Sequence, residues 1–258
     1  MLLHVGAFQL DIDSDRSSPW HRLTPQIRIA CALLFVFAAA LTPNGRWWTW
    51  LIYSIGLAIL LSISRITFPV LLRRVALEST FVGVVLIGTL FRSGGTILFQ
   101  WGWLQITTEG LTVLGSVSWK ALLSLLMLNL LVLTTSIPAL LHGMTALKMP
   151  PLLVAIMASM YRYIGVLSEE FTSMQRAAAS RNLTGSDRWR RLVVGNMFGS
   201  LFIRTYERGD RVYQAMLARG YTGLPPVHDL PRPQRADWFA LAAMICLVLA
   251  GQAAYLFP

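Results

Sequence analysis

Five stretches of the chain are apolar over almost the whole length that a membrane-spanning helix needs. About 20 helical residues, at a rise of 1.5 Å each, cover a hydrocarbon core roughly 30 Å thick. The first three stretches are close to the short limit, so flanking residues must extend them. The pattern predicts an all-α polytopic membrane protein with about five transmembrane helices, at residues 27–42, 47–63, 75–91, 111–133 and 238–257.

A different pattern occupies residues 136–237, between the fourth and fifth stretches. Apolar residues recur there at alternating steps of four and three, which predicts a long amphipathic helix from Pro151 to about Arg181. A second helix is predicted from about Asp187 to Arg219. We expect the first helix to act as a lever outside the membrane and to pack through the stripe Leu153, Met157, Met160, Ile164, Leu167, Phe171 and Met174.

The basic residues give the chain an orientation. With the N-terminus inside the cell, nineteen of the 22 lysines and arginines lie in cytoplasmic segments, as the positive-inside rule requires. The predicted organisation is a cytoplasmic N-terminal segment (1–26), transmembrane helices 1–4 (27–135), a cytoplasmic coupling-helix domain (136–237) and a last transmembrane helix that ends outside (238–258).

The composition excludes several classes of protein. The chain has 258 residues, of which 55% are hydrophobic and only 13% are charged, whereas about 25% charged residues is usual in soluble domains. A soluble enzyme is therefore excluded. The net charge of +10 follows from the membrane orientation and does not call for a nucleic-acid partner. The two cysteines lie inside apolar runs, which excludes a disulfide framework and a CxxC metal site.

The motifs of common catalytic sites are absent from the sequence. The chain has no GxxxxGK[ST] phosphate loop, so any energy from nucleotide hydrolysis by that route must come from a partner. It also lacks HExxH and any clustered set of His, Asp and Glu. Two charges, Glu78 and Lys120, fall inside predicted spans but towards their ends, which favours snorkelling or a local polar contact over an ion pathway.

Two arginines stand just before the residues predicted to end the two cytoplasmic helices. Arg181 precedes Asn182, and Arg219 precedes Gly220. Gly is the residue that most favours the left-handed conformation after a helix, Asn is the next choice, and a cation is favourable beside the terminal carbonyls. A single arginine of this kind can simply cap its own helix. The repetition on a second helix favours two fixed charges that are presented to a partner.

At these positions the sequence resembles the transmembrane (T) component of energy-coupling factor transporters, whose signature is two short Ala-Arg-Gly motifs at the ends of cytoplasmic coupling helices. The second motif, Ala218, Arg219 and Gly220, matches fully, and the first reads Ser180, Arg181 and Asn182. The N-terminal sequence SPWHRLTP at residues 18–25 resembles the cobalt-type family, CbiQ, although the family's basic residue after the proline is displaced to Arg28.

The resemblance implies a multi-pass scaffold in a bacterial inner membrane, with no catalytic activity of its own. It implies two CbiO-like ATPase subunits that hold ATP and Mg²⁺, and a CbiM-like capture subunit, with a CbiN-like accessory, that holds Co²⁺ or Ni²⁺. This chain is expected to bind no cofactor, metal or nucleic acid. The six motif residues are the expected ATPase contacts.

Three alternatives remain open at this point. The same scaffold serves nickel or vitamin importers, and the cargo site lies in another subunit. A stand-alone secondary carrier predicts transport without ATP, together with internal repeats and broken charged helices near the midplane, which the sequence lacks. A membrane-embedded enzyme needs a convergent His, Asp, Glu or Ser set at one depth, which the sequence does not offer.

Overall fold

The computed structural model describes residues 18–87, 97–101, 104–181, 187–222 and 234–256. These residues fall into two compact units, which we name the membrane unit (18–143 and 234–256) and the coupling unit (144–222). The boundary lies within helix α5, Ile137–Ala146. Gly143 of α5 lies against the start of α1, where a Cβ atom would contact Ile29 and the Pro25 backbone.

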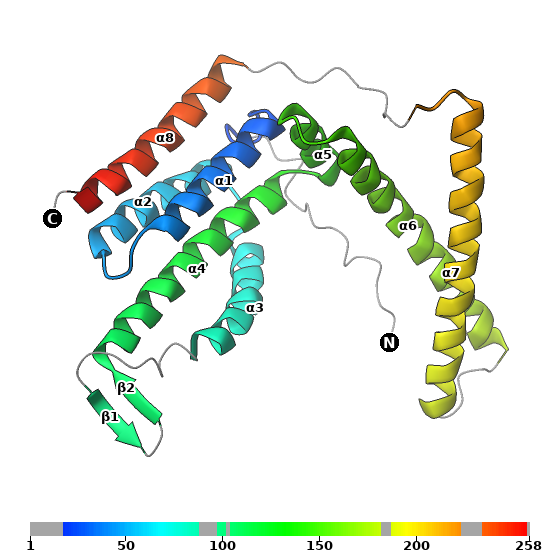
Figure 1. Ribbon diagram of the computed structural model, residues 1–258, viewed down its shortest axis with the longest axis horizontal. Helices are drawn as coiled ribbons and strands as arrows, with labels where there is room; N and C mark the ends of the chain where they lie inside the picture. The colour runs from blue at the N-terminus through cyan, green and yellow to red at the C-terminus, as the bar shows by residue number, and fades with distance from the viewer. Residues whose placement is uncertain (1–17, 88–96, 102–103, 182–186, 223–233, 257–258) are drawn as a thin grey trace. The chain divides into compact units, whose positions relative to one another are not determined.

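Each of the five predicted apolar stretches is a helix of the membrane unit (Figure 1). Three of these helices, α2, α4 and α8, are long and apolar enough to span a bilayer, and α1 is apolar but shorter. Helix α3 begins seven residues before the predicted stretch and takes in Arg73 and Arg74, while residues 88–91 of that stretch lie outside the described part. The observed helices are α1 Pro25–Leu41, α2 Trp47–Ser64, α3 Phe68–Ile87, α4 Thr108–Thr134 and α8 Arg235–Leu256.

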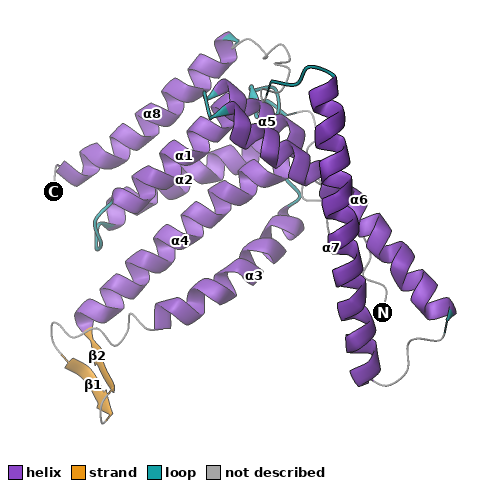
Figure 2. Ribbon diagram, turned by 45° about the vertical axis from the view of Figure 1, so that its right-hand side comes forward, coloured by secondary structure: helices purple, strands orange, loops and turns teal. Residues whose placement is uncertain are grey.

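Helix α4 lies at the centre of the membrane unit. It contacts α1, α2 and α3, and α8 packs against α1 and α2 (Figures 1 and 2). Helices α2 and α8 approach each other closely, because a side chain at Gly56 would overlap Leu247. Between α1 and α2, the rings of Phe35 and Tyr53 meet edge to face with centroids 5.7 Å apart. Such edge contacts add to the packing energy of apolar burial.

A short β-hairpin precedes α4 and is the one departure from helix among the described elements. Strands β1, Ile97–Trp101, and β2, Leu104–Thr107, pair antiparallel, with Trp101 opposite Leu104 (Figure 2). The pairing has an irregularity between Ile97 and Phe99. No strand is predicted between the apolar stretches that end at residue 91 and begin at residue 111, and the protein remains all-α in class.

The coupling unit contains two long helices that contact each other, α6 Pro151–Ser180 and α7 Asp187–Ala218. Both lie close to their predicted bounds, and α6 starts at the predicted proline. Helix α6 also meets the length and composition criterion for a membrane span, although the sequence analysis places it outside the membrane. Only 6% of its most apolar window is buried, so most of this apolar surface is exposed in the chain by itself.

Candidate functional site

The second arginine motif forms a complete helix-ending structure. The N–H of Tyr221 donates to the carbonyl of Met216 at 3.0 Å, and the N–H of Gly220 donates to that of Leu217 at 2.9 Å. Gly220 has φ +81°, the left-handed value. This pair of bonds is the Schellman motif, in which glycine takes the position after the cap. Arg219 is therefore the cap residue at the tip of α7, and its side chain is exposed.

The first motif stands at the end of α6. Ser180 is the last helical residue and donates its hydroxyl hydrogen to the carbonyl of Ala177 at 2.9 Å. Arg181 follows as the exposed cap residue, with φ −91° and ψ 12°. Asn182 lies outside the described residues. The backbone thus holds both motif arginines, Arg181 and Arg219, at helix ends, and their side chains are exposed.

The two tips are well separated. Arg181 lines the groove between α6 and α7, and Leu192 of α7 lines the same groove. Arg219 lies 27 residues further along α7, which at 1.5 Å per residue is about 40 Å away. The two motifs therefore form two separate, exposed basic helix ends and do not come together in one site.

The groove beside Arg181 has a volume of about 580 Å³. Apolar side chains such as Met174 and Met197 share its lining with Ser173, Asn196 and Ser200. Arg204 lines it as well, so two guanidinium groups from different helices border one hollow. This surface suits an acidic or polar group from a partner.

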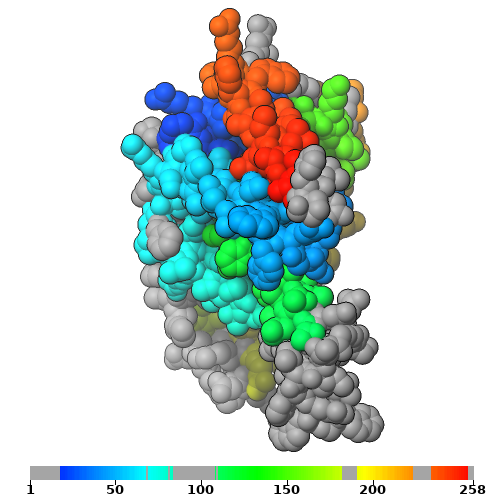
Figure 3. Space-filling model, turned by 90° about the vertical axis from the view of Figure 1, so that its left-hand side faces the viewer, coloured from blue at the N-terminus to red at the C-terminus, as the bar shows by residue number. Residues whose placement is uncertain are grey.

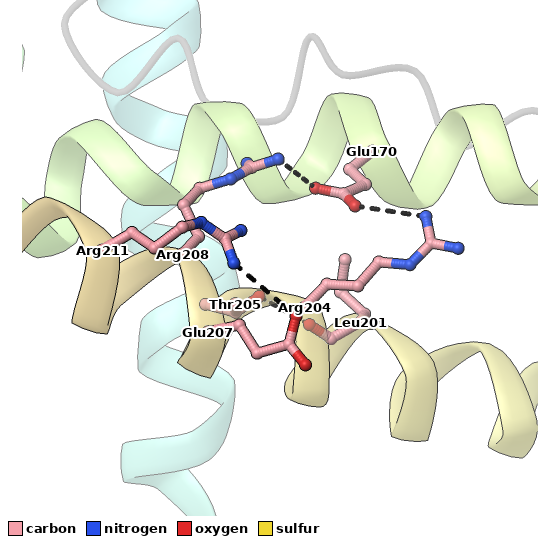
Figure 4. A network of polar contacts seen from close by, with 7 residues as sticks. All are labelled: Glu170, Leu201, Arg204, Thr205, Glu207, Arg208 and Arg211. Carbon is pink, nitrogen blue, oxygen red and sulfur yellow. Dashed lines mark hydrogen bonds and ion pairs between the residues drawn. The ribbon is translucent and has the colours of Figure 1, made fainter.

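A bridge between α6 and α7 holds the coupling unit together. Glu170 of α6 pairs with Arg208 at 3.2 Å and with Arg204 at 3.6 Å (Figure 4). The side chain of Glu170 is only 18% exposed, so solvent screens these contacts less than a surface pair. Next to it, the rings of Phe171 and Phe198 stack with centroids 4.8 Å apart. We name these three contacts between the helices, two ion pairs and one ring stack, the brace.

The predicted packing stripe of α6 divides into two parts. Its last members pack in the coupling unit, where Phe171 stacks on α7 and Met174 lines the groove. Its first members are exposed large hydrophobic residues, with Met160 at 59% and Leu153 at 47%. The complete predicted stripe comprises Leu153, Met157, Met160, Ile164, Leu167, Phe171 and Met174, of which the first four are exposed in this chain.

The two charges inside the predicted spans do not pair with each other. The amide of Asn129 donates to a carboxylate oxygen of Glu78 at 2.6 Å. The ammonium of Lys120 lies 5.5 Å from the centre of the Trp50 ring, within cation–π range. Both contacts are local and polar, as the sequence interpretation favoured over an ion pathway.

Sequence reasoning missed a buried polar cluster in the membrane unit. The guanidinium of Arg28 donates to the carbonyls of His21, Leu23 and Thr134, at 2.6, 3.0 and 2.7 Å, and to the hydroxyl of Thr135 at 3.3 Å. Arg28 is only 8% exposed. Arg28 stands three residues after Pro25, the last residue of the N-terminal motif, and from there it joins the N-terminal segment to the end of α4.

The same cluster contains a buried carboxylate. One oxygen of Asp237 accepts the N–H of Thr24 at 2.8 Å, and the other accepts the N–H of Gln234 at 2.8 Å. The second bond is half of a capping box at the start of α8. Asp237 thereby caps its own helix and joins it to the segment before α1. We name Arg28, Asp237 and their partners the polar lock.

Comparison with known proteins places this arrangement in a family. The sequence model of the CbiQ family, described as cobalt transport protein, matches residues 16–229. The energy-coupling factor transporter transmembrane protein EcfT of Lacticaseibacillus paracasei is 26% identical, over 90% of this chain and 91% of that protein. The EcfT proteins of Listeria innocua and Heliobacterium modesticaldum are 30% and 31% identical, over 79% and 80% of this chain and 80% and 81% of the relatives. The chain therefore belongs to the CbiQ family, the multi-pass membrane T components of energy-coupling factor transporters.

Proposed function

We propose that this T component couples ATP hydrolysis by two CbiO-like ATPase subunits to cobalt import through a separate capture subunit. The observation that supports this most is the pair of exposed cap arginines, Arg181 and Arg219, about 40 Å apart on α6 and α7. One tip seats in each ATPase, where acidic groups of a groove receive the guanidinium. ATP and Mg²⁺ belong to those partners, and this chain supplies the contacts.

The brace gives the tips a way to act on the rest of the complex. When the two ATPases close on ATP, they change the distance between the tips. Because Glu170 and Phe171 tie α6 to α7, a shift at one tip moves the two helices against each other and is passed from one helix to the other. A state change of this kind requires only a few kcal/mol of differential contact. Charged helix-tip contacts and apolar packing together supply that amount.

The exposed part of the α6 stripe is the proposed contact for the capture subunit. Met157 and Met160 are flexible and polarisable, so they fit a surface that must repack as the helices move. The partner at this surface is a CbiM-like subunit with a CbiN-like accessory, and that subunit holds the Co²⁺. Nickel is the alternative cargo, and this chain carries no site that distinguishes the two.

Charge reversal at the tips tests the ATPase contacts. We expect Arg181→Glu and Arg219→Glu each to lower ATPase recovery in a pull-down of the tagged chain from detergent-solubilised native membranes, and the double variant to abolish ATP-driven ⁵⁷Co²⁺ uptake. Arg176→Glu, an exposed position on α6 that precedes the tip, is the matched control. Full ⁵⁷Co²⁺ uptake by the double variant would contradict the proposal.

The cargo is tested separately in the intact complex. Uptake of ⁵⁷Co²⁺ and ⁶³Ni²⁺ is compared in cells that carry the complete transporter and in cells that lack this chain. Cobalt import that depends on this chain supports the cobalt type. Chain-dependent uptake of nickel alone reassigns the cargo, and recovery of a vitamin-binding capture subunit in the pull-down reassigns it to an organic substrate.

A further inference from the structure

The membrane unit contains an apolar pocket of about 530 Å³ between α2 and α8. Its walls include Ile59 and Ile63 on α2 and Phe239 and Ala243 on α8, and Trp20 of the N-terminal segment closes one end. The volume is in the range of small-ligand pockets, about 300–1,000 Å³. Phe239 is 76% exposed and Ile59 is 54% exposed, so these walls of the pocket are open to the surroundings of the bundle. Figure 3 shows the face on which α8 lies against α2.

The hollow follows from the packing of these two helices. They approach closely at Gly56, where a Cβ atom would overlap the side chain of Leu247. Towards the start of α8, three of the residues that line the pocket are small, namely Ala236, Ala240 and Ala243. Small side chains beside a close contact leave a space that the helices by themselves do not fill. The alanines of α8 therefore account for the hollow on that side of the pocket.

Two exposed arginines adjoin lining residues in the sequence, at the end of the pocket that the positive-inside rule places in the cytoplasm. Arg22 directly precedes the lining residue Leu23, and Arg235 directly precedes the lining residue Ala236. Both arginines are exposed. The neighbouring acid, Asp237, does not offset them at the surface, because it is 1% exposed and both its oxygens accept backbone N–H groups.

We propose that this pocket binds one anionic phospholipid of the cytoplasmic leaflet. An acyl chain fills the space between α2 and α8, and the phosphate lies beside Arg22 and Arg235. An apolar cleft with a basic rim at headgroup depth matches the two parts of such a lipid. The alternative occupant, a helix of a partner subunit, would explain the apolar walls, but it does not require two exposed arginines beside them, whereas the phosphate of an anionic lipid does.

Native mass spectrometry of the purified full chain tests the headgroup contact. The probes are dioleoyl phosphatidylglycerol and the zwitterionic dioleoyl phosphatidylcholine, added at equal concentration to delipidated protein. We expect one tightly held phosphatidylglycerol, retained in preference to phosphatidylcholine. The double variant Arg22→Gln, Arg235→Gln should lower that preference about tenfold or more. The control Arg73→Gln removes an exposed charge from α3, which does not line the pocket, and should retain the preference.

Filling the pocket tests the acyl-chain contact. Ala243→Phe places a ring in the hollow, whereas Ala242→Phe places the same ring at an exposed neighbour that does not line it. We expect only the first variant to lose the retained lipid. Equal retention of both lipids by the native chain, or unchanged retention after Ala243→Phe, would overturn the proposal.

Photo-crosslinking in membranes separates the lipid from a partner helix. A phosphatidylglycerol with a diazirine in its acyl chain should label pocket residues such as Ile59 and Phe239, both in the chain expressed alone and in the complex with its partners. If labelling of the pocket disappears in the complex while the chain alone is labelled, a partner subunit occupies the pocket and the proposal is wrong. Labelling spread evenly over the outer faces of α3 and α4 would also contradict it.

Discussion

Two arginines, one from each unit, have opposite surroundings. In the membrane unit, Arg28 is 8% exposed and its guanidinium donates four hydrogen bonds to groups of the chain itself. In the coupling unit, Arg219 is exposed at a helix tip that the Schellman bonds of the backbone hold in place. The same side chain thus stabilises the fold in one unit, whereas in the other it is exposed, as the proposed ATPase contact requires. Burial, more than residue type, separates the two roles.

The largest expected effect is on stability, and it distinguishes the two arginines directly. Arg28→Ala leaves three buried backbone carbonyls without their donor, so it should lower the free energy of unfolding by about 3–5 kcal/mol. Arg219→Ala removes an exposed side chain and should change it by less than about 0.5 kcal/mol. Thermal unfolding of both variants in one detergent, followed by circular dichroism, measures the difference. Similar losses in the two variants would remove the distinction between the units.

The other half of the polar lock should have a slightly smaller effect. Asp237→Ala leaves the N–H groups of Thr24 and Gln234 without an acceptor, which should lower the free energy of unfolding by about 3 kcal/mol. Asp237→Asn keeps one acceptor oxygen and should lose about half as much. The control Asp210→Ala removes an exposed acid that accepts only from Gln214 and should cost little. If Asp210→Ala destabilised the chain as much as Asp237→Ala, the lock would have no special role.

Sequence alone predicts the parts of this molecule that depend on local pattern. The five apolar stretches, the start of α6 at Pro151 and the left-handed Gly220 all follow from residues within a few positions of each other. The polar lock could not be predicted in this way, because Thr24 and Asp237 are 213 residues apart and meet only after the last helix packs against α1. The N–H of Thr24 is a backbone group, so no side-chain pattern marks its partner.

The coupling unit shows the same limit. The predicted stripe on α6 identifies which face of the helix is apolar, but it does not say where α7 crosses. In the structure the end of the stripe near Phe171 packs against α7, whereas Met157 and Met160 are exposed. Glu170 lies beside the stripe as one of several surface charges in the sequence, and only the packing of α7 reveals that it meets Arg204 and Arg208.

Removing the charge of the brace should have an intermediate effect on stability and a clear effect on coupling. Glu170→Gln weakens both ion pairs to α7, and since Arg204 is 60% exposed, the loss should be only about 1–2 kcal/mol. The ATP hydrolysed per ion imported should rise in the complete transporter, because the tips move without carrying both helices. Glu169→Gln, at the exposed neighbouring position, is the matched control. An unchanged ratio in Glu170→Gln would show that coupling does not pass through the brace.

The smallest expected effect on stability offers the sharpest test of the tip, because the chain contains a matched pair of glycines. Gly220 and Gly45 have φ +81° and +85°, and a Cβ atom at either would meet nothing within 4 Å. Alanine at each position therefore adds backbone strain alone, about 1 kcal/mol, with no steric clash. The two variants should lose equal stability.

They should differ in what they do to the complex. Gly45 lies in the turn between α1 and α2, where its N–H donates to Ser116 of α4, whereas Gly220 sets the direction in which the chain leaves Arg219. Gly220→Ala should reduce recovery of the ATPase in the pull-down, and Gly45→Ala should leave it unchanged. Equal recovery in both would mean that the fixed end of α7 is unnecessary for docking. Reduced recovery in both would mean that overall stability, and not the geometry of the tip, governs the contact.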